Sequence, residues 1–299
     1  MRPAPVLIGS LLLGCAILSA CSSSKTPNAG ADPDPDGGES TETLPDGAPA
    51  ETETVTVSEE KMSFQGRERR YLLVKPKSYD AERTYPLVLS FHGNPGYPEY
   101  QRNLLPFESV SKDDAIVVYP AAAHDDWDFQ PTDNVDIPWM LPLVDDVASK
   151  VNIDKARVLG YGYSGGAYFI SAAACRVGGI FEMIAILSGG APEAYKEGQA
   201  TTTQGCVVCD GTPLATLVVH GMEDKSVVPF EGGDFARKCW AETNGCTQDE
   251  LEDSEPSACQ TYKGCSAGHP TKWCAVPGQG HDAWKPSMQV AWDMFQALP

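Results

Sequence analysis

Six short apolar runs set the strongest limit on what this chain can fold into, because each is followed within two residues by glycine or proline. The runs are Leu87–Phe91, Ala115–Tyr119, Arg157–Leu159, Met183–Leu187, Leu217–Val219 and Lys272–Val276. Continuous apolar runs of this length are typical of strands buried on both faces of a parallel sheet. Helical stretches, such as 142–151 and 167–175, lie between several of them. This alternation predicts an α/β fold with a mostly parallel sheet and helices on both faces.

The first 54 residues differ in composition from the rest of the chain. Arg2 precedes an apolar stretch, 6–20, which is shorter than the roughly 20 residues of a membrane span and fits a secretory signal peptide over 1–20. Residues 21–54 are rich in Pro, Gly, Ser, Thr, Asp and Glu, so we expect a disordered tether there. A β-rich hairpin opens the remainder, which we expect to be one catalytic domain over 55–299.

The signal peptide ends in Leu18-Ser-Ala-Cys21, followed by three serines and a lysine. This segment resembles the lipobox of bacterial lipoproteins, in which the cysteine is acylated and becomes the mature N-terminus. The resemblance implies an exported protein that is held to a membrane by lipid on Cys21, at the cell envelope or outside the cell. The alternative is a plain signal peptide with a chance cysteine.

Charge limits the partners of the exported body. The chain carries a net charge of −19. Two basic and eight acidic residues leave −6 in residues 1–54, so the remainder carries −13. A field of this sign repels nucleic acid and anionic lipid headgroups, so we expect no nucleic-acid partner and a neutral substrate.

Eight cysteines follow Cys21, and an even number in an exported protein predicts disulfides. Sequence alone does not pair them, and the best single guess is Cys265 with Cys274, because a short loop joins them beside the last strand. Cys206-Val-Val-Cys209 has the spacing of a zinc-ligand pair, but no second pair follows at a suitable distance. Disulfides are therefore favoured, and no metal is expected.

A glycine-rich turn carries the clearest catalytic pattern. Gly162-Tyr-Ser164-Gly-Gly166 matches the G-x-S-x-G nucleophile elbow and lies, as that elbow requires, between a predicted strand and a predicted helix. Glycines two positions before and after the serine let strand and helix approach closely, which exposes the hydroxyl at the head of the helix. Ser164 is therefore the predicted nucleophile.

A serine hydroxyl needs a general base, and the chain has five histidines. In the α/β-hydrolase arrangement the chain order is serine, acid, histidine. Only His281 directly follows the last predicted strand, so His281 is the predicted base, although a loop histidine at the surface is the alternative. The acid should follow the strand that ends at His220. Asp224 is the predicted acid, and its neighbour Glu223 stays open.

Two backbone donors are expected to bind the oxyanion that forms during acyl transfer. One is the N–H of Gly165, directly after the nucleophile. The other is expected from Gly93 or Asn94, in the loop after the strand 87–91.

Aromatic side chains gather around the predicted mouth of the site. They are Tyr97 and Tyr100 beyond the oxyanion loop, Trp127 after an earlier strand, Tyr163 beside the nucleophile and Trp284 beside the base. Aromatic faces stack on sugar rings and phenyl groups, so these residues are predicted to contact substrate. The alternative for each is packing in the core.

These motifs together resemble a known family. His92-Gly93, the G-x-S-x-G-G turn, His220-Gly-x-x-Asp224 and Gly280-His281-x-x-Trp284 are similar to motifs of secreted esterases. That family includes feruloyl esterases, acetylxylan esterases and poly(3-hydroxybutyrate) depolymerases. The resemblance covers about residues 54–299, cysteine-bearing segment included. It implies the α/β-hydrolase fold, the triad of Ser164, Asp224 and His281, and no cofactor.

Two departures from the family pattern bear on substrate choice. The oxyanion segment reads Asn-Pro-Gly-Tyr-Pro, 94–98, in place of a glycine-rich run, and the stretch 246–259 is unusually acidic. The expected reaction is hydrolysis of a carboxylic ester through an acyl-enzyme. The expected substrate is a feruloyl or acetyl ester of plant polysaccharide, and poly(3-hydroxybutyrate) or its oligomers are the alternative. A non-enzymatic alternative, a surface lipoprotein that binds a glycan or a partner, conflicts with an intact serine, acid and histidine in the required order.

Overall fold

The computed structural model describes residues 54–129, 134–211 and 213–299. The predicted signal peptide, Cys21 and all of the predicted tether except Thr54 therefore lie outside the described residues. Within the described ranges, no helix is both long enough and apolar enough to cross a membrane.

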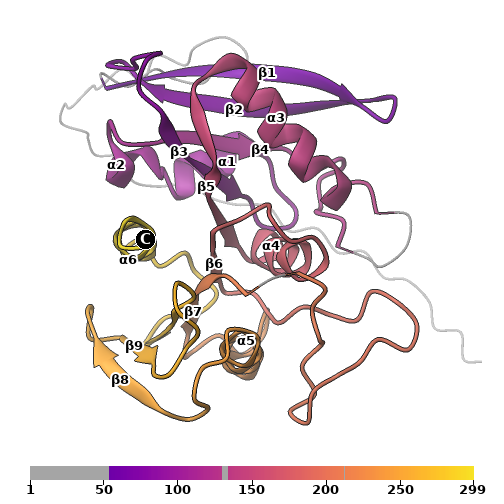
Figure 1. The fold of residues 1–299 in the computed structure, drawn as a ribbon, viewed down its shortest axis with the longest axis vertical. Helices are drawn as coiled ribbons and strands as arrows, with labels where there is room; N and C mark the ends of the chain where they lie inside the picture. Colours follow the sequence, from indigo (N-terminus) through magenta and orange to yellow (C-terminus); the bar gives the residue numbers. More distant parts are fainter. Residues whose placement is uncertain (1–53, 130–133, 212) are drawn as a thin grey trace, which may run out of the picture. The chain divides into compact units, whose positions relative to one another are not determined.

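A ten-stranded sheet forms the centre of the described domain (Figure 1). Its strand order is β1-β2-β4-β3-β5-β6-β7-β10-β9-β8. The strands are β1 Val55–Phe64, β2 Arg67–Pro76, β3 Tyr85–Phe91, β4 Ile116–Pro120, β5 Ile153–Tyr163, β6 Met183–Leu187, β7 Ala215–Gly221, β8 Leu251–Ser254, β9 Cys259–Tyr262 and β10 Thr271–Val276. The run from β4 to β10 pairs in parallel, while β1 and β2 on one side and β9 and β8 on the other pair antiparallel.

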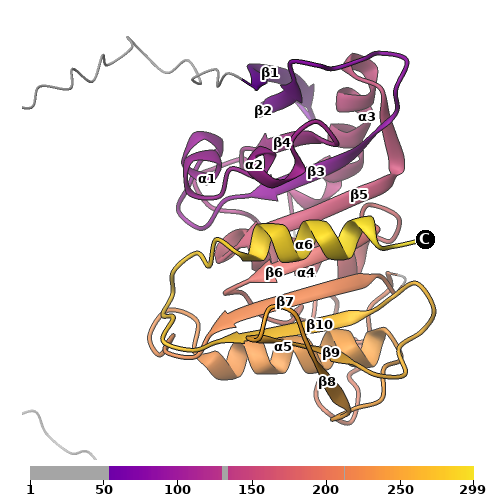
Figure 2. The ribbon, with the colours of Figure 1, turned by 90° about the vertical axis from the view of Figure 1, so that its left-hand side faces the viewer.

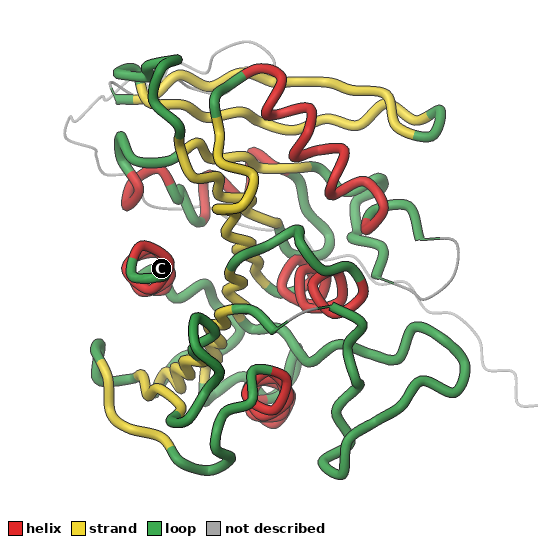
Figure 3. Tube along the Cα trace, in the orientation of Figure 1, coloured by secondary structure: helices red, strands yellow, loops and turns green. Residues whose placement is uncertain are grey.

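Helices cover both faces of this sheet (Figures 2 and 3). They are α1 Pro98–Leu104, α2 Glu108–Ser111, α3 Met140–Lys150, α4 Gly165–Arg176, α5 Phe230–Thr243 and α6 Ser287–Gln296, with a 3-10 turn at Ile137–Trp139. Helices α3, α4 and α5 pack in one apolar layer, and α6 packs in the other with the segment around α1 and α2. The predicted mostly parallel sheet with helices on both faces is therefore observed.

The burial of β3 shows why its sequence reads as a continuous apolar run. Successive residues of a strand point to opposite faces. Leu87, Leu89 and Phe91 enter the layer of α3 to α5, whereas Val88 enters the layer of α6, and all four are fully buried. Each of the six predicted runs lies on a strand of the sheet, except that Ala115 directly precedes β4, and β6 spans the same residues as its predicted run.

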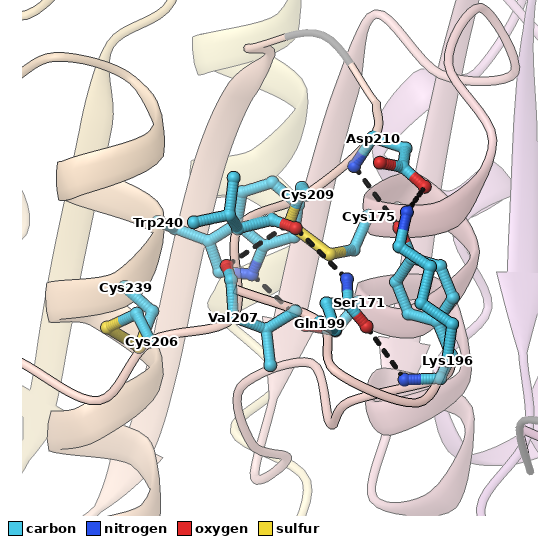
Figure 4. Close-up of a disulfide and its surroundings, with 12 residues drawn as sticks. Ser171, Cys175, Lys196, Gln199, Cys206, Val207, Cys209, Asp210, Cys239 and Trp240 are labelled. Atoms are coloured by element: carbon cyan, nitrogen blue, oxygen red, sulfur yellow. Dashed lines mark hydrogen bonds and ion pairs between the residues drawn. A yellow bond between two sulfur atoms is a disulfide. The ribbon is translucent and has the colours of Figure 1, made fainter. Parts of the chain in front are cut away.

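Four disulfides join the eight cysteines that follow Cys21, which confirms the prediction of disulfides. The pairs are Cys175–Cys209, Cys206–Cys239, Cys246–Cys265 and Cys259–Cys274. Figure 4 shows the first two, which lie in and beside the loop after β6. Because Cys206 and Cys209 bond to different cysteines, this C-x-x-C is not a pair of zinc ligands.

The predicted pair Cys265–Cys274 is wrong. Cys274 on β10 lies directly opposite Cys259 on β9 in the antiparallel register, so these two side chains meet across the strands. Cys265 follows β9 and bonds instead to Cys246, which precedes β8. The β8–β9 hairpin decides both pairs, and the acidic composition of 246–259, which overlaps the hairpin, does not predict it.

Candidate active site

Ser164 lies between β5 and α4 in a backbone conformation that L-residues rarely adopt, with φ 52° and ψ −117°. Its N–H donates to the carbonyl of Leu187 at 2.8 Å. A Cβ at Gly162 would lie 2.5 Å from the Gly166 carbonyl oxygen, and a Cβ at Gly166 would lie 2.5 Å from the carbonyl oxygen of Phe91. The two outer glycines of the turn are thus required because β5, α4 and the end of β3 touch through their backbones.

The side chains of the predicted triad meet at the carboxyl edge of the sheet. His281 Nε2 lies 2.9 Å from Ser164 Oγ, and His281 Nδ1 lies 2.6 Å from Asp224 Oδ2. An ionised carboxylate can only accept, so Nδ1–H donates to Asp224 and Nε2 is left to accept from the serine hydroxyl. The imidazole is therefore oriented to remove the proton of Ser164.

Asp224, rather than Glu223, is the acid that contacts His281. Asp224 is 2% exposed, and its Oδ1 accepts from two backbone N–H groups of its own loop, at 3.3 and 3.4 Å. Glu223 is exposed and forms an ion pair with Lys225 at 2.6 Å. Asp224 is therefore buried and directed at His281, whereas the adjacent Glu223 faces solvent.

The three residues predicted for the oxyanion site lie together beside Ser164. A Cβ at Gly93 would lie 3.3 Å from Ser164 Cβ, and a Cβ at Gly165 would lie 2.3 Å from Asn94 Cγ. Gly165 is the first residue of α4, so its N–H has no acceptor within the helix and lies at the positive end of the helix dipole. The backbone segments expected to bind an oxyanion are thus in contact around the serine.

The chain is similar in sequence to fungal enzymes. No model of a known protein family matches this chain. The chain is 28% identical over 226 residues to the probable feruloyl esterase C of Aspergillus flavus. The aligned region covers 72% of this chain and 77% of that protein. The feruloyl esterase C of Emericella nidulans is 27% identical over 226 residues, covering 72% and 76% of the two chains.

Solved structures show the same architecture. The acetyl xylan esterase from Aspergillus awamori gives a TM-score of 0.63 at 16% identity, over 80% of this chain and 99% of that chain. A ferulic acid esterase from Anaeromyces mucronatus gives a TM-score of 0.54 at 15% identity, over 83% and 92% of the two chains. The protein has the α/β-hydrolase fold. The fold predicted from the sequence is thereby confirmed.

Trp127 does not line the mouth of this site, so its prediction as a substrate contact is wrong. It is 3% exposed and stacks on Phe169 of α4, with ring centroids 4.6 Å apart. Its indole N–H donates to the carbonyl of His92 at 2.9 Å, and its backbone N–H donates to Asn94 Oδ1 at 3.1 Å. The ring is buried because it packs against α4, and its two hydrogen bonds to His92 and Asn94 fix the oxyanion loop from the interior of the protein.

The segment that carries Trp127 is itself held by a buried ion pair. Asp136 is fully buried and accepts from Arg69 at 2.5 Å. The same carboxylate accepts from the backbone N–H of Ala123 at 3.0 Å and of Asp128 at 2.8 Å. Nothing in the local sequence marks this pair, because its two members are 67 residues apart.

His92 is buried directly under the oxyanion loop. Its Nδ1 lies 2.8 Å from the Gly93 carbonyl oxygen, and its Nε2 lies 3.4 Å from the backbone nitrogen of Ala122. Burial lowers the pKa of His92, which favours a neutral ring that donates through Nδ1 and accepts at Nε2. His92 therefore supports the oxyanion loop from a buried position.

Tyr163 lies beside His281. Its hydroxyl donates to the backbone carbonyl of His281 at 2.7 Å, and the two rings are 5.5 Å apart between centroids. Burial, and then the nearby charge of Asp282 and the hydroxyl of Tyr100, raise the pKa of Tyr163 to about 12. Tyr163 is thus a neutral donor that fixes the histidine loop.

The remaining aromatic residues fall into two groups. Tyr97 is 53% exposed and Tyr100 is 45% exposed, and their rings lie 6.0 Å apart at the start of α1, directly after the oxyanion loop. Trp284 is half-buried and packs against the α6 layer. Of the predicted aromatic contacts, the two tyrosines are the ones that offer open ring faces.

We expect Trp127→Phe to impair the site through the oxyanion loop. The change removes the donor to the buried His92 carbonyl, and an unsatisfied buried acceptor should lower the free energy of unfolding by about 2 kcal/mol. Displacement of the loop should also lower kcat for p-nitrophenyl acetate by at least about ten-fold. Urea unfolding and steady-state kinetics measure both effects.

The matched control is Trp292→Phe, which removes the same atoms from a buried tryptophan in the opposite layer, on α6. It should destabilise the fold while kcat stays within about two-fold of wild type. Equal effects of the two variants on kcat would contradict the role assigned to Trp127.

Proposed function

We propose that this protein is a serine esterase that hydrolyses feruloyl or acetyl esters of plant polysaccharide. The observation that carries the proposal is the contact chain from buried Asp224 through His281 to Ser164, with distances of 2.6 and 2.9 Å. A carboxylate, an imidazole and a serine hydroxyl in this order make a nucleophile with an oriented base.

In the first half-reaction Ser164 Oγ attacks the ester carbonyl carbon while His281 Nε2 takes the serine proton. The carbonyl oxygen becomes an oxyanion, which backbone N–H groups at Gly165 and at Gly93 or Asn94 stabilise. The bond to the leaving alcohol then breaks, and His281 gives the proton to the alcohol oxygen. Water attacks the acyl-enzyme by the same steps, which releases the acid and restores Ser164.

Three observations support the substrate class. Relatives of the chain are named feruloyl esterases, and a structural neighbour is named an acetyl xylan esterase. Residues 55–299 carry a net charge of −13, which disfavours a polyanionic substrate. The exposed pair Tyr97 and Tyr100 offers ring faces next to the oxyanion loop, where sugar or phenyl rings can stack.

Substitutions in the triad test the reaction. Ser164→Ala and His281→Ala should each lower kcat/KM for p-nitrophenyl acetate by at least about 1,000-fold, because the residues act as one unit. Asp224→Asn should also lower kcat/KM for p-nitrophenyl acetate strongly, since an amide no longer fixes the tautomer of His281. The matched control is Glu223→Gln, the same chemical change at the adjacent residue, which should stay within about two-fold of wild type. Near-normal hydrolysis by Ser164→Ala, or a larger loss in Glu223→Gln than in Asp224→Asn, would overturn the assignment.

The exposed tyrosine pair tests the substrate. The double variant Tyr97→Ala/Tyr100→Ala should raise KM for feruloylated or acetylated xylan about ten-fold, the size expected for losing two stacked rings. Its KM for methyl ferulate and p-nitrophenyl acetate should change less than about two-fold. The control Tyr97→Phe/Tyr100→Phe keeps the ring faces and should behave as wild type. If wild type cleaves 3-hydroxybutyrate oligomers and neither carbohydrate ester, the polyester alternative replaces this proposal.

We also propose that the protein is exported and anchored by lipid on Cys21. The segment Leu18–Cys21 and the disulfides, which form in oxidising compartments, support this proposal. Cys21→Ala should move the protein from the detergent phase to the aqueous phase in a Triton X-114 partition. Cys15→Ala, which changes a cysteine of the same apolar stretch, should leave partitioning unchanged. Detergent partitioning that survives Cys21→Ala would contradict the anchor.

A further inference from the structure

His220 is a buried histidine next to the triad for which the proposed reaction has no use. It lies near the end of β7, one residue before Gly221, and its side chain is fully buried. Its Nε2 lies 2.8 Å from the carbonyl oxygen of Val228 and 3.6 Å from Asp224 Oδ2. The ring therefore lies inside the loop that carries the acid.

The contacts of the ring determine its protonation. The Val228 carbonyl only accepts, so Nε2 carries a proton and donates it. Within the described part of the chain, Nδ1 is buried and has no hydrogen-bond partner. Burial lowers the pKa of His220. A neutral ring with its proton on Nε2 satisfies both facts, because a charged ring would bury a second N–H without an acceptor.

This donor organises the surroundings of the acid. The hydrogen bond to the Val228 carbonyl fixes residues 224–228, whose N–H groups at Val227 and Val228 donate to Asp224 Oδ1. His220 Nε2 also lies 3.6 Å from Asp224 Oδ2. This is too far for a hydrogen bond, but close enough for the positive end of the N–H bond to favour a buried carboxylate. Oδ2 is the same oxygen that accepts from His281.

We propose that His220 is a positioning residue that keeps the Asp224 carboxylate aimed at His281 by holding the acid loop through a neutral Nε2–H. The inference rests on the proposed function, in which Asp224 orients the base. The titratable groups that face His220 are Asp224, from its own loop, and His281, from the loop after β10. His220 thus supplies a donor to the acid loop without adding a second cation that would compete with the imidazolium of the triad.

Helix α5 is shaped to accept this ring. A Cβ at Gly233 would lie 2.3 Å from His220 Nδ1 and 2.4 Å from its Cγ, so glycine is required where the helix passes over the imidazole. The Phe230 ring meets the imidazole edge-on, at 6.2 Å between centroids. The adjacent Gly232 has no such constraint, since a Cβ there would meet only a Val228 methyl group at 3.5 Å. The two neighbouring glycines therefore offer a matched pair of substitutions.

The decisive experiment compares His220→Met with His220→Gln in the full-length protein. Methionine keeps length and apolar character but removes the donor, whereas glutamine retains an N–H at a similar distance from the backbone. In His220→Met, kcat for p-nitrophenyl acetate should fall about ten-fold with KM unchanged. The acid limb of its kcat/KM profile should move to higher pH, because a carboxylate with fewer donors makes the Asp224–His281 pair hold its proton more tightly. His220→Gln should retain the wild-type acid limb.

Gly233→Ala displaces the His220 ring without altering its chemistry, because the new Cβ would lie 2.3 Å from Nδ1. It should therefore reproduce the lower kcat and the shifted acid limb of His220→Met. Gly232→Ala should match wild type in both. Circular dichroism and urea unfolding report whether each variant is folded. An acid limb that stays at the wild-type pH in folded His220→Met, whatever its kcat, would reduce His220 to a packing residue and overturn the proposal. Failure of the proposed function is distinguishable, since it would show as ester hydrolysis that persists in Ser164→Ala.

Discussion

The site depends on backbone segments that approach one another more closely than side chains permit. The turn at Gly162 and Gly166 touches the end of β3, and Gly165 presses against Asn94. On the other side of the site, a Cβ at Gly221 would lie 2.3 Å from the carbonyl oxygens of Gln279 and Gly280, just before the base. Parallel strands bring their carboxyl ends to one edge of the sheet, and these backbone contacts fix the positions of Ser164, Asp224 and His281 at that edge.

The two buried carboxylates at this edge, Asp136 and Asp224, differ in the charged and polar groups that contact them. Asp136 is neutralised by Arg69, a permanent cation, and is surrounded by backbone donors. Asp224 contacts two imidazoles and two backbone N–H groups, and no lysine or arginine of the described residues forms an ion pair with it. Arg69 therefore neutralises the charge of Asp136, whereas Asp224 has no permanent cation beside it and can stabilise a charged His281 in the proposed reaction.

The parts of the structure that follow from local pattern were predictable. The apolar runs predicted the central strands because both faces of a covered parallel sheet are apolar, and the motif around Ser164 predicted its turn because few residues besides glycine fit there. The predictions for Trp127 and Cys265 were wrong because each depends on a distant partner, Phe169 of α4 in the first case and the β8–β9 hairpin in the second. Helix α5 carries no clear helical pattern, since it contains two glycines, and one of them is required by the ring of His220 rather than by the helix.

The first two disulfides overlap along the chain, because Cys206 lies inside the loop that Cys175 and Cys209 close, while Cys239 lies outside it. A single peptide-bond cleavage anywhere between Cys175 and Cys239 therefore leaves the two pieces joined by at least one sulfur bridge. The long loop after β6 is the kind of surface segment that proteases cut first. A nick there does not release either piece, so α4 and α5 stay tethered to each other through the loop. The two pieces would separate only after the disulfide that bridges the cut is also reduced.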